Sequence, residues 1–207
     1  DAVEGMVGVG ILKHIDISDL NSLKPVTTVV RSGGKRAINN VKNLVNEGKA
    51  LVIKPMPNSL LATKVDDYVI AFNNGNSNLQ GQLGEEISEI LAKEIDSGPV
   101  LNIKVNESGH GFDAMMFESV LENPTVIRAI ESKPLNSTSV ELPGTNNGTQ
   151  MSTQWKTTKI NEMRANENKY IKDLGDILFK NQSKIEGFVM TIDKDFKQII
   201  FLKLDKY

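Results

Sequence analysis

The sequence predicts an α/β protein in which a mixed β-sheet is flanked by helices and preceded by a small N-terminal α+β segment. Apolar residues recur at helical spacing over residues 82–96 and again over about 150–178. Short runs rich in β-branched residues lie between these helices and after them. From residue 82 the expected order is helix, three strands, helix, two strands, which is typical of a mixed sheet covered by helices.

The C-terminal part is punctuated by clear breaks. Ser97-Gly98-Pro99 ends the first helix, and the long second helix is expected to break near Ala165-Asn166. A turn at Asp193-Lys-Asp195 separates the last two strands. The expected strands are residues 100–105, 112–117, 125–132, 187–192 and 198–204.

The N-terminal part reads as a separate segment, residues 1–78. Asn73-Asn-Gly-Asn-Ser-Asn78 is a run of six polar turn-forming residues, so the boundary with the second domain, residues 79–207, is placed after it. The chain begins at Asp1 without an initiator Met, and we expect it to be cut from a longer polypeptide. The segment is expected to contain strands at 11–17, 26–30, 50–53 and 68–72. A helix with apolar residues at Ile38, Val41, Leu44 and Val45 is expected to follow Ser32-Gly-Gly34 and to end at Gly48.

Composition excludes several kinds of site. The 207 residues include no Cys, which rules out a thiol nucleophile, a disulfide framework and a cysteine zinc site. The only histidines are His14 and His110, so a histidine-rich zinc site is also excluded, and His110 in its Gly-His-Gly turn is expected to be solvated. The net charge of −2 gives no sign of a nucleic-acid binder, and no apolar run approaches the ~18 residues of a membrane span.

One hairpin places charged residues together. Glu122-Asn123-Pro124 is a strong turn signal, and a hairpin centred near residue 122 puts Asp113 directly opposite Glu131, with Cβ atoms about 5 Å apart. Lys133 is two residues beyond Glu131 and projects from the same face. Because neighbouring carboxylates repel unless a cation lies between them, the pattern predicts a divalent metal site. Lys133 would orient the attacking water and stabilise charge on a phosphate.

Three motifs carry a family resemblance. Gly111-Phe-Asp113, Ile130-Glu-Ser-Lys133 and Gln150-Met-Ser-Thr-Gln-Trp155 resemble the PD-(D/E)xK, restriction-endonuclease-like toxin domains at the C-termini of polymorphic bacterial toxins, which include contact-dependent growth inhibition effectors. The resemblance covers residues 81 to about 160, and the final strands are compatible with it. The long, polar interval from Lys133 to Gln150 and the lack of a basic run are departures from the family pattern.

The resemblance implies a metal-dependent endonuclease with a PD-(D/E)xK nuclease-like core. Its metal ion, with Mg²⁺ favoured and Mn²⁺ or Zn²⁺ as alternatives, would be held by Asp113, Glu131 and a glutamate from the helix that begins Gly84-Glu-Glu86. Helical geometry favours Glu86, which borders the apolar stripe, although the family pattern accepts Glu85 as well. Gln150 would support the site. Gln150 and Trp155 could equally start a helix and fill its core.

The same resemblance implies a toxin and its partners. Such a domain is secreted or delivered from a cell surface as part of a larger polypeptide, acts in the cytoplasm of a target cell, and requires a cognate immunity protein. Residues 1–78 would then serve in entering target cells or as an accessory. DNA is favoured as substrate because the nuclease fold cuts DNA more often than RNA. The long helix offers possible phosphate contacts, namely Lys156, Lys159, Arg164, Lys169 and Lys172.

Two alternatives remain open at this point: a tRNA-cleaving toxin of the same fold, and a non-catalytic interaction module in which Asp113, Glu131 and Lys133 form an ordinary cross-strand salt-bridge group. A phosphate-binding loop at Ser32-Gly-Gly-Lys-Arg36 is disfavoured, since the spacing of that motif is missing and a plain turn explains the glycines.

Overall fold

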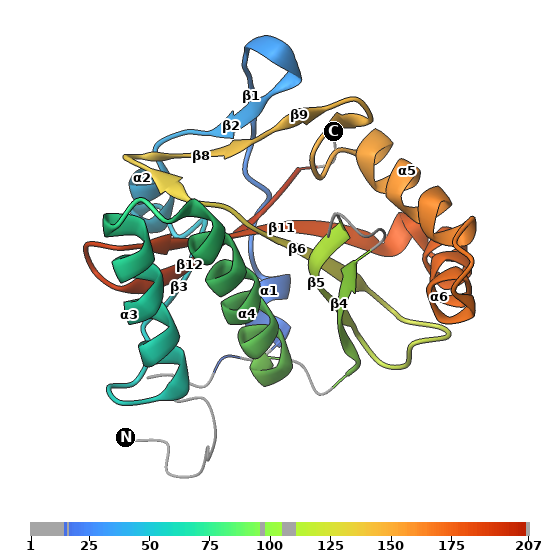
Figure 1. The fold of residues 1–207 in the computed structure, drawn as a ribbon, viewed down its shortest axis with the longest axis horizontal. Helices are drawn as coiled ribbons and strands as arrows, with labels where there is room; N and C mark the ends of the chain where they lie inside the picture. The colour runs from blue at the N-terminus through green and yellow to red at the C-terminus, as the bar shows by residue number, and fades with distance from the viewer. Residues whose placement is uncertain (1–14, 16, 96–97, 105–110, 206–207) are drawn as a thin grey trace.

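A six-stranded mixed sheet runs through the middle of the computed structural model, which describes residues 15, 17–95, 98–104 and 111–205 (Figure 1). The strand order is β3-β12-β11-β6-β5-β4, in which β11 and β6 are parallel and every other neighbouring pair is antiparallel. The α/β class and the mixed sheet predicted from the sequence are confirmed. The bounds are β3 Leu51–Ile53, β4 Val100–Lys104, β5 Gly111–Phe117, β6 Ile127–Ser132, β11 Ile185–Asp193 and β12 Gln198–Lys203.

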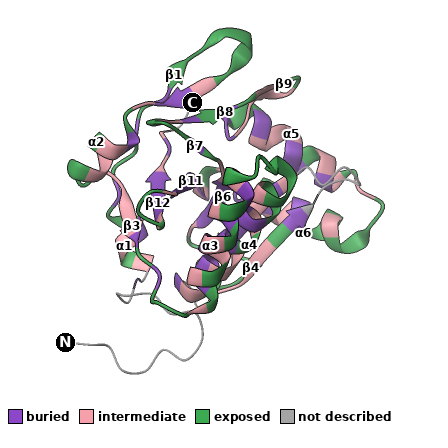
Figure 2. Ribbon diagram, turned by 60° about the vertical axis from the view of Figure 1, so that its left-hand side comes forward, coloured by how far each residue is buried: buried purple, intermediate pink, exposed green. Residues whose placement is uncertain are grey.

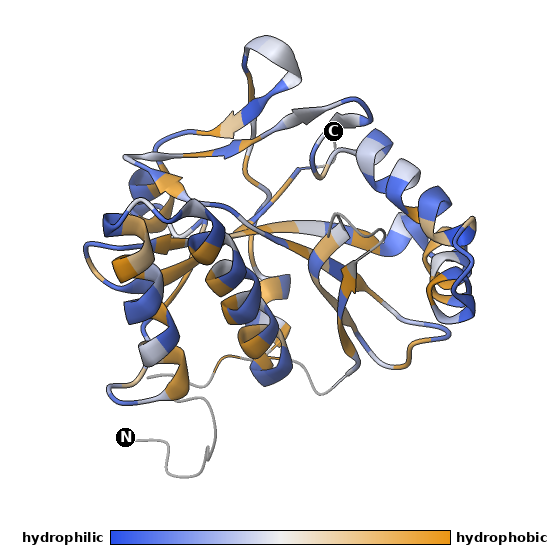
Figure 3. Ribbon diagram, viewed as in Figure 1, coloured by the Kyte–Doolittle hydropathy of each residue, from blue (hydrophilic) through white to orange (hydrophobic). Residues whose placement is uncertain are grey.

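Helices cover both faces of this sheet. On β5, Ala114 and Met116 belong to the core cluster shared with α3 (Leu60–Asn73) and α4 (Ser77–Ile95), whereas Met115 and Phe117 belong to the cluster shared with α5 (Thr153–Arg164) and α6 (Lys169–Lys180). The division follows from the alternation of side chains along a strand. Figure 3 shows apolar and polar residues alternating along α3 and α4, as expected for helices that bury one face.

The helix after β6 makes the parallel pairing possible. Because α5 and α6 return the chain across the sheet, β11 can lie parallel to β6. The predicted break in this helix is confirmed: α5 ends at Arg164, and Asn168 caps the start of α6 by accepting a hydrogen bond from the backbone N–H of Tyr170. None of the helices in the described part of the chain combines the length and apolar character needed to cross a bilayer.

The N-terminal segment packs into the same core, which corrects the expected division. β3 pairs with β12 in the main sheet, and Val26 forms a bridge with Leu204. Leu61 and Val65 share a core cluster with Ile130 of β6. The boundary expected between residues 78 and 79 falls inside α4, and the polar run before it is the end of α3, a tight turn and the start of α4. Polar turn residues end a helix as readily as a domain, and here they join two packed helices.

Residues 68–72 are helical, so the strand predicted there is wrong. Ser59 begins α3 by accepting a hydrogen bond from the backbone N–H of Ala62, and the buried residues Leu61, Val65 and Tyr68 follow at helical spacing. The β-branched pair Val69 and Ile70 suggested a strand, but burial of one helical face decides the outcome.

Other N-terminal elements are shorter than predicted. The helix expected between Gly34 and Gly48 is only α2 (Val41–Asn46), because β2 (Arg36–Ile38) occupies its first part. The strand expected at 26–30 is reduced to β1 (Val29–Val30). Most of the strand expected at 11–17 lies outside the described residues, and Ile17 begins α1 (Ile17–Asn21). The loop between β1 and β2, which contains the 3-10 turn Ser32–Gly34, is exposed at one end of the molecule (Figure 2).

The polar interval from 133 to 150 contains two small pairs of strands that the sequence did not predict. β7 (Leu135–Asn136) and β8 (Ser139–Leu142) extend the N-terminal pair into a four-stranded sheet of order β1-β2-β8-β7. β9 (Gly144–Thr145) and β10 (Gly148–Thr149) form a separate two-stranded hairpin. A second 3-10 turn, Gln182–Lys184, leads into β11.

Candidate active site

Asp113 and Glu131 meet at the end of the β5–β6 ladder. The register runs from Phe117 opposite Ile127 to Ala114 opposite Ile130, which is the register that the hairpin prediction required. Asp113 and Glu131 follow directly beyond this ladder, and their carboxylates lie close enough to repel each other. Oδ2 of Asp113 accepts a hydrogen bond from the backbone N–H of Ser132 at 2.8 Å. Two carboxylates are therefore fixed side by side on neighbouring strands.

One oxygen of Glu131 is fully engaged and the other is not. Oε2 accepts hydrogen bonds from Nζ of Lys133 at 3.1 Å and from Nε2 of Gln150 at 2.7 Å. Oε1 is buried without a hydrogen-bond partner among the described residues. The structure thus brings together the predicted residues Asp113, Glu131, Lys133 and Gln150.

Glu131 is only 1% exposed, and this burial changes the pKa of its carboxyl group. Loss of solvent around the carboxylate, followed by repulsion from Asp113, raises its pKa to about 8, although Lys133 acts in the opposite direction. Without a further cation the group holds its proton near neutral pH. An added positive charge beside both carboxylates would remove that cost.

The donor set fits a hard divalent cation held by two protein carboxylates. Asp113 and Glu131 would supply the oxygen ligands of such an ion, and the buried Oε1 of Glu131 has no hydrogen-bond partner among the described residues that would compete with it. Within residues 15–205, leaving aside the undescribed stretches, there is no group of three or more Asp, Glu, His or Cys side chains placed to hold one ion. A site of this kind would take its remaining ligands from water and substrate, as Mg²⁺ sites commonly do.

The helix glutamate near the site is Glu85, which corrects the choice of Glu86. Glu85 lines the same cavity as Asp113 and Glu131. Glu86 is exposed and pairs with Lys64 of α3, with 2.5 Å between Nζ and Oε2. The apolar stripe of α4 faces the sheet. Glu86 lies at the border of this stripe and therefore reaches α3, whereas Glu85 lies over the ends of β5 and β6 that line the cavity.

Gly84 explains why α4 can lie so close to the site. A Cβ at this position would stand 2.3 Å from Oγ of Ser132, the residue that follows Glu131. Any larger residue would force Ser132 or the helix to shift, so glycine allows the helix backbone to approach β6 at that point. The Gly-Glu pair therefore works as a unit: the glycine permits contact and the glutamate faces the cavity.

Several residues of the motif from Gln150 to Trp155 have structural roles. Met151 is buried with a φ of 67°, which turns the chain between Gln150 and the helix. Oγ of Ser152 caps α5 by accepting a hydrogen bond from the backbone N–H of Trp155 at 3.1 Å. Trp155 packs edge-on against Phe112, with ring centroids 5.3 Å apart. The buried cap and aromatic contact fix α5, and the turn before it delivers Gln150 to Glu131.

These residues surround a cavity of about 520 Å³. Its walls come from α4, from the ends of β5 and β6, from the β9–β10 hairpin and from α5. The sequence did not identify the hairpin wall, although Asn146-Asn147-Gly148 is a turn signal. The lining residues are Gly81, Glu85, Gly111, Asp113, Glu131, Ser132, Lys133, Pro143, Thr145, Asn146, Asn147, Gln150, Trp155 and Lys159.

A second lysine stands in this cavity. The side chain of Lys159 is 9% exposed, and its Nζ lies 2.7 Å from Oε2 of Glu162, one turn further along α5. Oε1 of the same glutamate accepts a hydrogen bond from Nδ2 of Asn147 at 3.4 Å, which ties the β9–β10 hairpin to the helix. Two lysines, Lys133 and Lys159, therefore line the cavity together with Glu85, Asp113 and Glu131.

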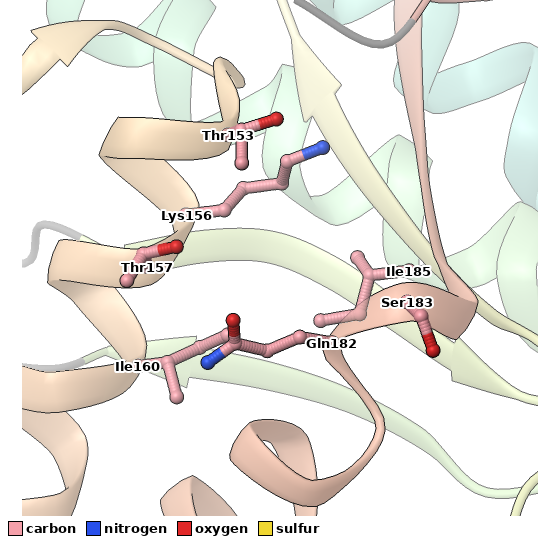
Figure 4. A pocket seen from close by; sticks show the side chains of 7 residues that line it. All are labelled: Thr153, Lys156, Thr157, Ile160, Gln182, Ser183 and Ile185. Atoms are coloured by element: carbon pink, nitrogen blue, oxygen red, sulfur yellow. The ribbon is translucent and has the colours of Figure 1, made fainter.

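A smaller cavity of about 290 Å³ lies between α5 and the segment that enters β11 (Figure 4). Thr153, Lys156 and Thr157 line it on one side and Gln182 and Ser183 on the other. None of its lining residues is acidic. Glu85, Asp113 and Glu131 line the larger cavity instead. His110, expected to be solvated, lies outside the described residues.

Comparison with known proteins adds no relative: no family model, no curated protein and no solved structure matches this chain.

Proposed function

We propose that the protein is a metal-dependent endonuclease with a PD-(D/E)xK nuclease-like core. The observation that carries the proposal is the closeness of the carboxylates of Asp113 and Glu131, with Lys133 and Gln150 both bonded to one oxygen of Glu131. Asp113 lies on one strand, Glu131 and Lys133 lie at the end of the next, and Gln150 lies just before a helix and supports Glu131. Together these residues make a site suited to phosphodiester hydrolysis.

The arrangement of elements around the site supports the same proposal. α4 precedes three antiparallel strands, the crossover helices follow, and β11 then pairs in parallel with the strand that carries Glu131 and Lys133. This is the order expected of the PD-(D/E)xK core. The two acids and the lysine lie where β5 and β6 open into the cavity.

Each residue has a separate role in the proposed reaction. Asp113 and Glu131 hold the ion, which when bound polarises the phosphate and lowers the pKa of a water. Lys133, 19% exposed at its side chain, reaches Glu131 from the cavity rim and stabilises negative charge on the phosphate. Gln150 holds the carboxylate of Glu131 in one orientation. Glu85 adds negative charge at the wall and draws the ion in.

The wider biological setting remains part of the proposal. We favour DNA as substrate and Mg²⁺ as the ion, and we infer a toxin that is delivered as part of a larger polypeptide and neutralised by an immunity protein. A tRNA-cleaving toxin is the alternative of the same fold. The Lys133–Glu131 ion pair also suits a non-catalytic module in which the charges only stabilise the sheet.

One experiment separates these possibilities. The purified chain is incubated with plasmid DNA and with total tRNA, each with Mg²⁺ or with EDTA. Nicked or linear plasmid formed only with Mg²⁺ supports the DNA endonuclease, and a single tRNA cut with intact plasmid supports the alternative. Glu131→Gln should abolish cleavage, and Glu141→Gln, an exposed glutamate on β8, is the matched control. Absence of metal-dependent cleavage on both substrates leaves the non-catalytic module.

A further inference from the structure

Charge is distributed unevenly along this chain, whose net charge is only −2. Residues 20–46 contain five Lys or Arg and no Asp or Glu, and residues 142–161 contain two Lys and again no acidic residue. The rest of the chain therefore carries all of the negative charge. Basic residues gathered on one face are the usual electrostatic mark of a surface that binds nucleic acid.

The two basic stretches meet in the folded protein. Gly144 of the β9–β10 hairpin packs on the β1–β2 loop so closely that a Cβ would stand 2.3 Å from the carbonyl oxygen of Gly33. Oγ1 of Thr149 donates a hydrogen bond to the carbonyl oxygen of Gly34 at 2.6 Å. Figure 1 and Figure 2 both show the loop, the hairpin and the start of α5 at the same end of the molecule. Segments more than a hundred residues apart thus form one surface.

A hollow on this surface joins the loop to the candidate active site. It is lined by Gly34 and Arg36 near the loop, by Thr145 of the hairpin, and by Thr153 and Gln154 at the start of α5. The described residues that line it include no Asp or Glu. Thr145 also lines the cavity that contains Asp113 and Glu131, so the hollow adjoins that cavity.

The loop presents its basic side chains to solvent. Arg31 and Lys35 are both exposed, and the backbone N–H of Arg31 donates to the carbonyl oxygen of Lys35 at 2.8 Å. The guanidinium of Arg31 bonds to the amide oxygen of Asn39, which leaves its charge unneutralised. The four-stranded sheet behind the loop contains one acidic residue, Glu141, in register with Ala37. Because successive residues of a strand face opposite sides, Glu141 projects away from the face that carries Arg36.

The start of α5 adds a partial positive charge to the hollow. The first backbone N–H groups of a helix have no acceptor within that helix. Ser152 accepts the hydrogen bond from Trp155, whereas Thr153 and Gln154, the first two residues of α5, line the hollow. Such a helix start favours phosphate oxygens, and here it lies beside basic side chains.

We infer that the β1–β2 loop and the start of α5 form a face that binds the phosphodiester backbone of the substrate on one side of the scissile phosphate. Arg31 and Lys35 contact phosphates there, and Arg36 lies in the hollow between them and the active site. The inference rests on the proposed nuclease function. It adds that the N-terminal segment binds substrate, besides completing the sheet.

The test measures binding and its salt dependence. The full chain with Glu131→Gln, which should not cleave, is titrated with a short DNA duplex and with total tRNA at several salt concentrations. Adding Arg31→Ala and Lys35→Ala should weaken binding roughly tenfold and lower the slope of log K against log salt by about 2, because each phosphate contact contributes about 0.9. The matched control is Lys93→Ala with Lys197→Ala, two exposed lysines paired with Glu89 and Asp66, which should change neither quantity.

The outcomes separate this inference from the nuclease proposal. Unchanged binding and slope in the Arg31 and Lys35 variant, beside intact cleavage by the parent protein, overturns the inference alone. The expected loss of binding, with no cleavage by the parent protein under any metal, supports the face and overturns the nuclease. No binding of either nucleic acid overturns the inference as well.

A vesicle arm tests the other anionic partner that such a face fits. Val29 and Val30 beside Arg31 are 47% and 67% exposed, a combination that also suits a lipid surface. Binding to vesicles of phosphatidylcholine with phosphatidylserine is measured for the same proteins. We expect the two substitutions to weaken binding to nucleic acid. Loss of vesicle binding with unaltered nucleic-acid binding would assign the face to a lipid surface and overturn the inference.

Discussion

Gln150 donates a hydrogen bond from Nε2 to Oε2 of Glu131 over 2.7 Å and so fixes which carboxylate oxygen remains for other partners. Lys133 bonds to the same Oε2, and Oε1 is buried without a hydrogen-bond partner among the described residues. A buried carboxylate with one satisfied and one orphaned oxygen costs stability unless a cation or a proton reaches it. This arrangement and the packing around it should govern both cleavage and the stability of the folded protein.

Glu85 and Glu86 form a matched pair for mutation. Glu85→Gln should lower cleavage about tenfold at limiting Mg²⁺, because it removes negative charge from the cavity wall. Glu86→Gln should leave cleavage unchanged, since it removes only an exposed ion pair with Lys64. The measurement is cleavage rate against Mg²⁺ concentration for both proteins. The reverse order of effects would reinstate Glu86 as the residue at the site.

Divalent ions should stabilise the folded protein. An ion at 100 times its Kd adds about 2.7 kcal/mol, which corresponds to roughly 5–10 °C in Tm for a chain of this size. Asp113→Asn keeps an acceptor for the Ser132 N–H but loses a charge, and it should lose most of the shift. Thermal unfolding with Mg²⁺, Mn²⁺ or EDTA measures both proteins. Equal shifts in the two would place the ion elsewhere.

Stability without metal should fall as the pH rises. The pKa of Glu131 is about 8 in the folded protein and near the ordinary 4.5 when unfolded, so between these values the folded state holds the extra proton. The contribution is fully present below about pH 4.5 and is lost as the pH passes 8, on the order of 5 kcal/mol in total. Urea unfolding in EDTA from pH 5 to 9 measures it. Glu131→Gln should flatten this slope, and parallel curves for the two proteins would contradict the raised pKa.

Substitution by alanine at two glycines of α4 should change the free energy of unfolding in opposite directions. Gly84→Ala places a Cβ against Ser132 and should cost about 1–3 kcal/mol in the free energy of unfolding. Gly81→Ala meets nothing within 4 Å and should stabilise the helix by up to about 1 kcal/mol. Urea denaturation measures each. Addition of Ser132→Gly should rescue Gly84→Ala, and failure of the rescue would mean that another contact sets the helix position.

Residues 81–207 should not fold by themselves. Removing residues 1–80 strips β3 from the edge of β12 and uncovers the α4 face that packs on α3. Circular dichroism and thermal unfolding of the fragment should show no cooperative transition, and adding residues 1–80 as a separate polypeptide should restore one. A fragment that melts cooperatively and cleaves like the whole chain would instead support the two-part division suggested by the sequence.

Local signals predicted the strands and helices that surround the site. The turn at Glu122-Asn123-Pro124 set the register that brings Asp113 to Glu131, because a hairpin's register is fixed by its centre. The break near Ala165 and the final hairpin were also predicted, since polar turn residues and period-two alternation act within a few residues. The errors at residues 68–72 and at the boundary after residue 78 came from signals that packing overrides.

The sequence by itself determined the mixed α/β class and the closeness of Glu131 to both Asp113 and Lys133, because these depend on periodicity and on one turn. Only the tertiary structure decided that Glu85 rather than Glu86 lines the cavity, because the approach of Gly84 to Ser132 sets the rotation of α4. It also decided that the N-terminal segment completes the sheet and that the β9–β10 hairpin encloses the site. Those contacts join residues more than a hundred positions apart, such as Gly34 and Thr149, and local sequence patterns carry no record of such distant partners.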